Sequence, residues 1–405
     1  MPMPMAIQII LLVSLAATDV LIGIASLGVF WAFFAIAALS WHGRSRTPAP
    51  WPTSAKWLAL VLVLMAVSTV LNGAGRPESL AYAALFGLYG LWLLKARDSF
   101  SADAVGRAMK ITLGAYFLSA LATTLLIRLG IDDLNSFPLT RVWTNTNSGE
   151  KRPLGFSSEP SYAAFIVAFC WIALVRLDRI RPGRRDGFGM WTAATLVALV
   201  LLGSIYGYLL SIVVLVTTVQ LLPRDVRPAI VIAAVLAALA AYVLLPLDDD
   251  SRSLRILSAV MSGDLETWLI EDTSSFFRFG PFFTYMVSAN FGDVQTWLGH
   301  GASSASLFFV DLFREHIEQN VEAVELGFVP SFLYDYGLVT GAAFLAFVYR
   351  LTQGQHRVAI AMMLLLLVFN ANFSTQMLWF AVTCAVISRT KSDGAPMSAS
   401  MPSLP

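Results

Sequence analysis

The chain reads Arg152-Pro153-Leu154-Gly155-Phe156-Ser157-Ser158-Glu159-Pro160-Ser161-Tyr162 directly before an apolar run, 163–175. A run of this kind without charges predicts a membrane helix, and Pro160 suits its first turn. Glu159 is therefore expected where hydrocarbon meets the outer aqueous phase. Ionisable groups are costly at such positions, so a carboxylate there indicates a functional site.

The composition extends this expectation to the whole chain. Of 405 residues, 57% are hydrophobic and 13% are charged, and the mean hydropathy is +0.70. No soluble fold buries so much apolar surface, so we expect an all-α polytopic membrane protein. The net charge of +1 and the scattered basic residues predict no nucleic-acid partner. Cys170 and Cys384 lie in apolar runs far from any histidine, which favours packing roles over a disulfide or a zinc site.

About twelve apolar runs suit membrane helices. We expect roughly 10 to 12 crossings, because only Thr18-Asp19 and 203–207 separate two of the neighbouring pairs. The runs are 5–20, 22–41, 56–72, 79–94, 110–129, 160–175, 189–203, 206–222, 228–246, 326–349, 357–372 and 374–388. The first run has no basic n-region or cleavage site, so it is expected to remain as an uncleaved helix.

Basic residues predict the orientation. Alternate loops hold 18 of the 27 Lys and Arg residues, which places both termini in the cytoplasm by the positive-inside rule. The chain then divides into an N-terminal bundle of about nine helices, 1–246, which includes an external segment, 130–158, and a large external loop, 247–325. C-terminal helices, 326–389, and a disordered tail, 390–405, follow.

The large loop carries thirteen acidic residues and four arginines, Arg252, Arg255, Arg278 and Arg314. An acidic excess is usual for a solvated loop, so the arginines are the departure from background. Within it, apolar residues recur at helical spacing and predict an amphipathic helix lying over the bundle. These residues are Phe309, Phe313, Ile317, Val321 and Val324.

Several common motifs are missing from the sequence. It has no phosphate loop, no Gly-x-Gly-x-x-Gly after a strand and no His-Glu-x-x-His, which disfavours ATP-driven transport and Rossmann-type redox chemistry. The four histidines form no recognisable metal cluster. The run Asp248-Asp249-Asp250 contains an Asp-x-Asp pattern that holds a divalent cation in some glycosyltransferases. The interpretation we favour is a helix end that reaches water.

The segment around Glu159 has two interpretations. As a ligand site, Arg152 offers planar, bidentate donors to a phosphate, Gly155 lets the backbone approach a ligand, and Glu159 can accept a proton from a sugar hydroxyl. As a helix start, Ser157 or Ser158 is the N-cap and Glu159 is favoured by the helix dipole. Both interpretations can hold together.

Three residues further along extend the candidate site. Arg278 lies among aromatics, as a ligand-binding group or as an interfacial arginine held by cation–π contacts. His300, in Gly299-His300-Gly301, is more often structural. Asp335 falls about two turns inside a membrane helix and needs a partner, which we expect to be an arginine or a hydroxyl. The candidate substrate-binding residues are Lys151, Gly155, Ser158, Tyr162, Arg252, Arg255, His300 and Asp335.

The order of these elements resembles the O-antigen and exopolysaccharide polymerase (Wzy-like) family. The shared features are Arg-x-x-Gly-Phe-Ser-x-Glu-Pro-Ser at a helix start, an external loop with Arg and Gly-His-Gly, and a helix reading Leu-Tyr-Asp-Tyr-Gly-Leu. The resemblance covers about residues 130–350. The related O-antigen ligases carry His-Asn where this chain has Leu326 and Gly327, which favours the polymerase.

The resemblance implies a GT-C-like fold in the bacterial inner membrane and metal-independent, inverting glycosyl transfer without a cofactor on the periplasmic side. It implies an undecaprenyl-diphosphate-linked oligosaccharide as substrate, membrane lipids around the chain and a chain-length regulator as partner. Arg152 and Glu159 fall in the matched element, and Arg278 falls where the family places an essential arginine; these three are the catalytic candidates. The alternatives are an O-antigen ligase-type transferase and a transporter or lipid-linked-sugar flippase. A flippase should carry charges lining a central cavity, whereas most helices here are free of charge inside.

Overall fold

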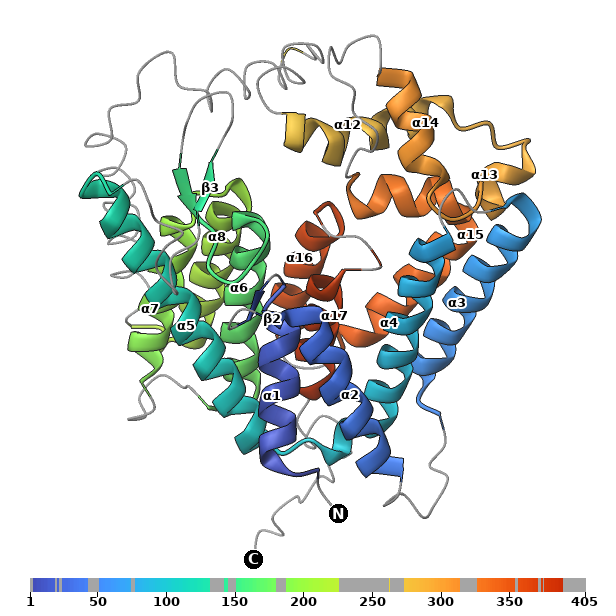
Figure 1. Ribbon diagram of the computed structural model, residues 1–405. Helices are drawn as coiled ribbons and strands as arrows, with labels where there is room; N and C mark the ends of the chain where they lie inside the picture. The colour runs from blue at the N-terminus through green and yellow to red at the C-terminus, as the bar shows by residue number, and fades with distance from the viewer. Residues whose placement is uncertain are drawn as a thin grey trace, which may run out of the picture.

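The computed structural model describes residues 3–18, 20–21, 24–42, 51–73, 77–131, 142–144, 151–179, 187–225, 262, 273–313, 326–353, 356–370, 373 and 375–388. These residues are mostly helical (Figure 1). The first helices are α1 (Met5–Ala16), α2 (Ser26–His42), α3 (Thr53–Asn72), α4 (Pro77–Ala96), the short 3-10 helix η1 (Arg97–Ser99), α5 (Ala102–Arg128), α6 (Pro160–Arg176), α7 (Phe188–Leu201) and α8 (Ile205–Leu221). They are followed by α12 (Thr273–Ser288), α13 (Val294–Leu298), α14 (Ser304–Phe313), α15 (Phe328–Leu351), α16 (Arg357–Val368) and α17 (Gln376–Ile387).

Every predicted apolar run coincides with one of these helices, except 228–246, which lies outside the described residues. Among the described residues, four helices are long and apolar enough to cross a membrane, namely α3, α4, α5 and α15. The described residues also form shorter apolar helices, which supports an all-α membrane protein. The crossing count and the GT-C-like architecture stay predictions.

Two short hairpins depart from the expected all-helical pattern. Strand β1 (Val20–Leu21) pairs antiparallel with β2 (Ile24–Ala25) between α1 and α2. Strand β3 (Val142–Thr144) pairs with β4 (Lys151–Pro153), which places Trp143 opposite Arg152. The second hairpin leads into α6 and so positions the segment around Glu159.

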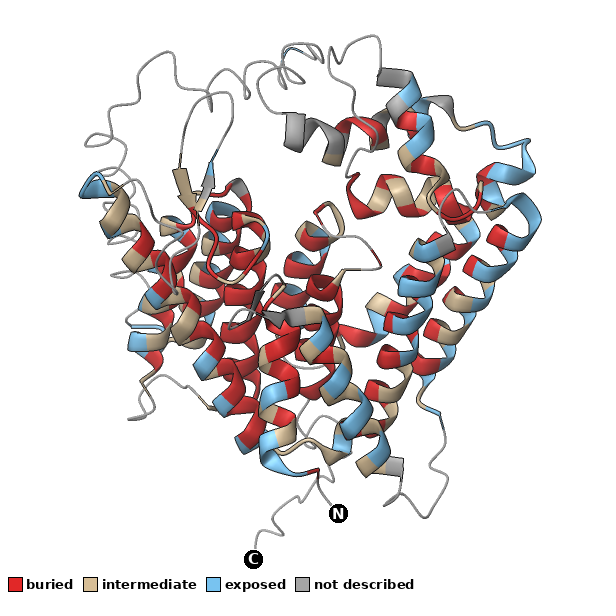
Figure 2. Ribbon diagram, viewed as in Figure 1, coloured by how far each residue is buried: buried red, intermediate tan, exposed pale blue. Residues whose placement is uncertain are grey.

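Helix α6 forms the centre of the bundle. All of its residues except Tyr162 are buried, and it packs against α5, α7, α8 and α17 (Figure 2). Within α6, the indole Nε1 of Trp171 donates a hydrogen bond of 3.0 Å to Oγ1 of Thr192 on α7. An apolar helix of 17 residues is therefore surrounded by protein instead of lipid.

The bundle has two faces, called upper and lower as drawn in Figure 1. Helix α1 begins and α17 ends at the lower face, while α3 ends and α6 and α15 begin at the upper face. At the lower face, Nη1 of Arg176 donates to the carbonyl of Ala385 at 2.9 Å and to Oγ of Ser388 at 3.1 Å. Helices at the two ends of the described chain thus share one face, as an even number of crossings requires.

The predicted amphipathic helix begins earlier than its apolar pattern suggested. Helix α14 starts at Ser304 because Asp335 of α15 accepts hydrogen bonds from the backbone N–H groups of Ser303 and Ala305. Phe309 is fully buried and lies 5.7 Å from the ring of Tyr334, so its predicted inward orientation is confirmed. The remaining part of the prediction, 314–325, lies outside the described residues.

Candidate functional site

An ion pair joins two of the predicted catalytic residues. Nη2 of Arg278, on α12, donates a short hydrogen bond to Oε2 of Glu159, which directly precedes α6. Oγ of Ser161 donates to the same oxygen at 2.8 Å. The guanidinium carbon of Arg278 lies 5.9 Å from the ring centroid of Tyr206, on the first turn of α8. The two charged side chains are only 14% and 24% exposed, so water screens their charges less than at an open surface.

The backbone conformation at the start of α6 places Glu159 in this position. Its backbone is extended, with φ −139° and ψ 149°, and it is the N-cap residue, followed by Pro160 in the first turn. The predicted N-caps, Ser157 and Ser158, were wrong. Ser157 is fully buried and shares a 2.9 Å hydrogen bond with Tyr116. The Glu159 carboxylate accepts hydrogen bonds from Arg278 and from the Ser161 hydroxyl and makes no capping hydrogen bond to a backbone N–H of α6.

Gly155 fixes the loop that precedes Glu159. Its φ is +63°, and a Cβ there would lie 2.6 Å from Cδ1 of Tyr116 on α5. Tyr116 in turn donates to the carbonyl of Ala16 at the end of α1, at 2.9 Å. The close approach that we predicted for a ligand is therefore made by Tyr116, and Gly155 acts by seating the loop on α5.

Replacing Gly155 by Ala is expected to destabilise the protein by about 1–3 kcal/mol, because it adds both backbone strain and a clash with Tyr116. Thermal unfolding of the detergent-solubilised protein measures this. The matched control is Gly114→Ala on α5, where a Cβ meets open space and helix propensity favours Ala by about 1 kcal/mol. Equal melting temperatures for the two variants would contradict the packing role of Gly155.

Arg152 borders the same site from β4. The position of a Cβ on Gly203, in the turn between α7 and α8, is 3.7 Å from Cδ of Arg152. Gly203 lies three residues before Tyr206, so Arg152 and Arg278 both flank the start of α8. Lys151 adjoins Arg152 on β4, so the described residues around the pair include the cations Lys151, Arg152 and Arg278 and the carboxylate of Glu159.

The charge state of Arg278 follows from its neighbours. Burial by itself lowers its pKa, but the Glu159 carboxylate, with smaller contributions from Tyr206 and Tyr162, raises the pKa overall. Arg278 therefore stays cationic, and Tyr162 lies within its electrostatic range. Of the other predicted residues near this pair, Ser158 is exposed.

His300 belongs to a different junction, where α3, α13 and α15 meet. Its ring stacks on Tyr334 at 4.1 Å, and its backbone N–H donates to the Tyr334 carbonyl at 3.0 Å. Beside it, Oγ of Ser68 donates to the carbonyl of Asp335 at 2.9 Å. These contacts support the structural interpretation of His300.

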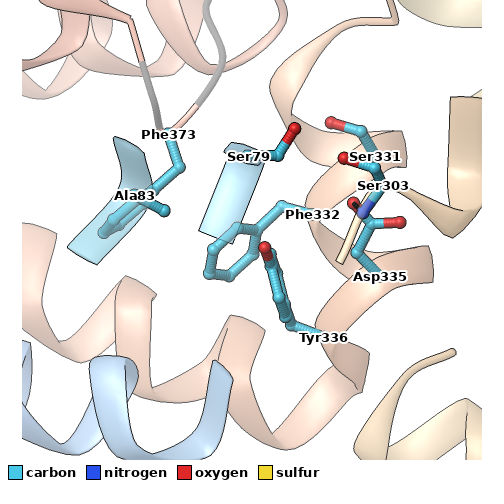
Figure 3. A pocket seen from close by; sticks show the side chains of 8 residues that line it. All are labelled: Ser79, Ala83, Ser303, Ser331, Phe332, Asp335, Tyr336 and Phe373. Atoms are coloured by element: carbon cyan, nitrogen blue, oxygen red, sulfur yellow. Dashed lines mark hydrogen bonds between the residues drawn. The ribbon is translucent and has the colours of Figure 1, made fainter. Parts of the chain in front are cut away.

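Asp335 lies in the same junction and is buried. The arginine or hydroxyl partner that we predicted was wrong, because its carboxylate accepts from backbone N–H groups, at 2.9 Å from Ser303 and 2.7 Å from Ala305. It borders a cavity of about 30 Å³ (Figure 3), which is large enough for a water molecule. The cavity is lined by Ser79, Ala83, Ser303, Ser331, Phe332, Asp335, Tyr336 and Phe373.

Gly327, at the start of α15, connects the Arg278–Glu159 pair with the junction that holds His300 and Asp335. A Cβ on Gly327 would lie 2.7 Å from the carbonyl oxygen of Arg278 and 2.8 Å from that of Phe369. Only a residue without a side chain lets α12, α15 and the end of α16 meet this closely. Gly327 thus fixes the backbone of Arg278.

Tyr206 and Ser161 were missed as site residues, because Tyr206 was assigned to a turn and Ser161 to the helix start. Arg252, Arg255 and the run 248–250 lie outside the described residues. Within the described part of the chain, no three His, Cys, Asp or Glu side chains come together as metal ligands. No family model matches the chain, and no curated protein matches it significantly.

Proposed function

We propose that this protein joins polyprenyl-diphosphate-linked oligosaccharide repeats into a polymer at the upper face of the bundle. The observation that carries the proposal is the shielded Arg278–Glu159 pair, which unites a cation from α12 with the carboxylate of the Arg-x-x-Gly-Phe-Ser-x-Glu-Pro-Ser element. Arg152 and Lys151 add positive charge beside it. Arginine side chains suit a diphosphate, and the motif resembles that of O-antigen polymerases.

The chemistry needs no nucleotide. A hydroxyl of the acceptor sugar attacks the anomeric carbon of the donor, the bond from that carbon to the diphosphate oxygen breaks, and the diphosphate leaves with the electron pair. Arg278 and Arg152 stabilise the charge that develops on the leaving group. Glu159 takes the proton of the attacking hydroxyl. Attack opposite to the leaving group inverts the anomeric carbon.

The ion pair suits both roles of its members. Arg278 uses one Nη2–H on Glu159 and has further N–H donors for phosphate oxygens. A diphosphate that binds Arg278 competes with Glu159 for it, which frees the carboxylate to act as the base. Ser161 keeps the released carboxylate in place through its hydroxyl.

The distribution of buried charge favours a site on one face over a transport path. Among the described residues, the buried charged side chains are Arg176 and Asp335. Arg176 lies at the lower end of α6 and bonds to the end of α17, whereas Asp335 lies at the upper junction. A charge-lined path through the middle of the bundle, as a flippase requires, is not seen in this part of the chain.

The size of lipid-linked glycans in cells that lack the protein tests the proposal. Loss of a polymerase leaves single repeats on the outer leaflet, whereas loss of a flippase traps them on the inner leaflet. Loss of a ligase leaves finished polymer on the lipid. Single repeats accessible from outside support the proposal, and either of the other patterns contradicts it.

The proposed orientation predicts which face labels from outside. With Cys170 and Cys384 replaced by Ala, Asp311→Cys on α14 should react with a membrane-impermeant maleimide in intact spheroplasts. Arg350→Cys, at the lower end of α15, should react only after permeabilisation. Both positions are exposed, so burial does not confound the comparison. Labelling of position 350 alone in intact spheroplasts would place the site in the cytoplasm and contradict the proposal.

A further inference from the structure

An exposed apolar surface lies between α12 and α13, away from the Arg278–Glu159 pair. It comprises Met286, Val287, Phe291, Val294 and Trp297, called here the 286–297 patch. Val287 is 89% exposed, Phe291 59% and Val294 65%. Asp293 is the one charged residue in this segment, and Lys and Arg do not occur in it. A surface of this composition needs an apolar environment.

The patch is fixed to the end of a membrane-crossing helix. Nδ2 of Asn72, the last residue of α3, donates to the carbonyl of Gly299 at 3.1 Å. The backbones of Gly73 and Gly301 approach so closely that no Cβ fits between them. Helix α3 has 20 residues, which at 1.5 Å per residue span about 30 Å, the thickness of the hydrocarbon core. The patch therefore lies level with the upper membrane boundary.

The last turn of α3, which contacts the loop of the patch, is also exposed and apolar. Val70 and Leu71, in the last turn of α3, are 83% and 63% exposed, on a helix that is long and apolar enough to cross a membrane. Exposed residues run along α3 and across α13 on the same side of the molecule (Figure 2). The exposed apolar flank of α3 thus lies on the same side of the molecule as the 286–297 patch.

We infer that the 286–297 patch docks into the boundary between headgroups and acyl chains of the upper leaflet. Trp297 suits this depth, because its ring is amphipathic and its Nε1–H already donates to the carbonyl of Phe291 at 2.9 Å. The absence of Lys and Arg from the segment fits neutral or zwitterionic lipids, and docking should not depend on anionic ones.

Docking also holds Arg278 at a defined height, a consequence that rests on the proposed function. Arg278 lies nine residues before Val287 on the same helix, α12, a separation of about 13 Å. Docking at one end of α12 therefore limits how far the guanidinium at the other end can move from the membrane surface. A diphosphate carried on a membrane-embedded lipid is found at that surface.

Spin labels measure the docking directly. In a background with Cys170 and Cys384 replaced by Ala, labels are placed at 287, 291 and 294 in nanodiscs of zwitterionic lipid. Relative accessibility to oxygen and to a water-soluble nickel chelate reports depth. Labels at 67, on the lipid-facing flank of α3, and at 311, on the exposed side of α14, provide the membrane and water references.

Labels at 287, 291 and 294 should favour oxygen, as the label at 67 does, and should do so equally with anionic lipid added. A preference for the nickel chelate, as at 311, overturns the inference. Low accessibility to both reagents also overturns it, because a protein partner or a second copy then covers the patch. The labels at 287, 291 and 294 should lie at the same depth in the Glu159→Gln variant. Docking is thereby tested separately from catalysis. Phe291→Asp with Val294→Asp should move the label at 287 to the water reference and leave single repeats unextended.

Discussion

Replacing Arg278 by Lys is expected to lower polymer formation on the order of 10²-fold, although the positive charge is kept. Nη2 of Arg278 bonds to Glu159 while the rest of the guanidinium faces Tyr206, a geometry that an ammonium group cannot reproduce. Lys can replace the ion pair but not the planar, bidentate contact with a diphosphate. Polymer length and yield, measured in cells that express the variant at normal abundance, report the effect.

The chain offers a matched control for this substitution. Nη2 of Arg179, three residues after the end of α6, pairs with Oδ1 of Asp103, in the first turn of α5, at 2.8 Å. This pair lies at the end of α6 opposite to Glu159 and outside the proposed site. Arg179→Lys makes the same substitution in a more exposed ion pair, and polymer should be unaffected. If Arg278→Lys also left normal polymer, Arg278 would be an interfacial anchor and not a catalytic residue.

Replacing Glu159 by Gln should lower chain extension by about 10²-fold or more while protein abundance stays normal. The amide keeps the shape of the carboxylate and its contact with Ser161 but cannot take a proton from the acceptor hydroxyl. If Glu159 served only to begin α6, the same change would cost about 0.3–1 kcal/mol of dipole interaction, and polymer length would be nearly unchanged. In vivo polymer length and thermal unfolding separate these outcomes.

Exchanging the two charges provides a sharper comparison. The double variant Glu159→Arg with Arg278→Glu restores an ion pair between the same positions. If the pair is only structural, this variant should recover both the melting temperature and the polymer that the single variants lose. We expect stability to recover and polymer to remain absent. Asp103→Asn, at the other ion pair, is the control for loss of a paired carboxylate.

Much of the fold could be predicted because hydrophobic runs leave a direct trace in the sequence. The resemblance made Glu159 and Arg278 candidates for one site, but their direct ion pair was not predicted, since 119 residues separate them and no local pattern encodes the contact. Tyr206 was missed for the same reason. For Gly155, a positive φ could be expected because glycine adopts it readily. Its contact with Tyr116 could not be predicted, because that contact depends on how α5 packs against the loop. Asp335 was expected to need a side-chain partner, yet the free N–H groups at the start of α14 satisfy it.

Chain extension by the purified protein tests the central claim most directly. The reconstituted protein is supplied with polyprenyl-diphosphate-linked repeats and excess EDTA, and the products are resolved by size. We predict a ladder of two or more repeats that persists in EDTA, because Arg152 and Arg278 supply the positive charge that a metal would otherwise provide. Unextended repeats, with or without divalent cations, would contradict the polymerase. Extension lost in EDTA and restored by magnesium or manganese would contradict the arginine-based site and favour Asp248-Asp249-Asp250 as the catalytic centre.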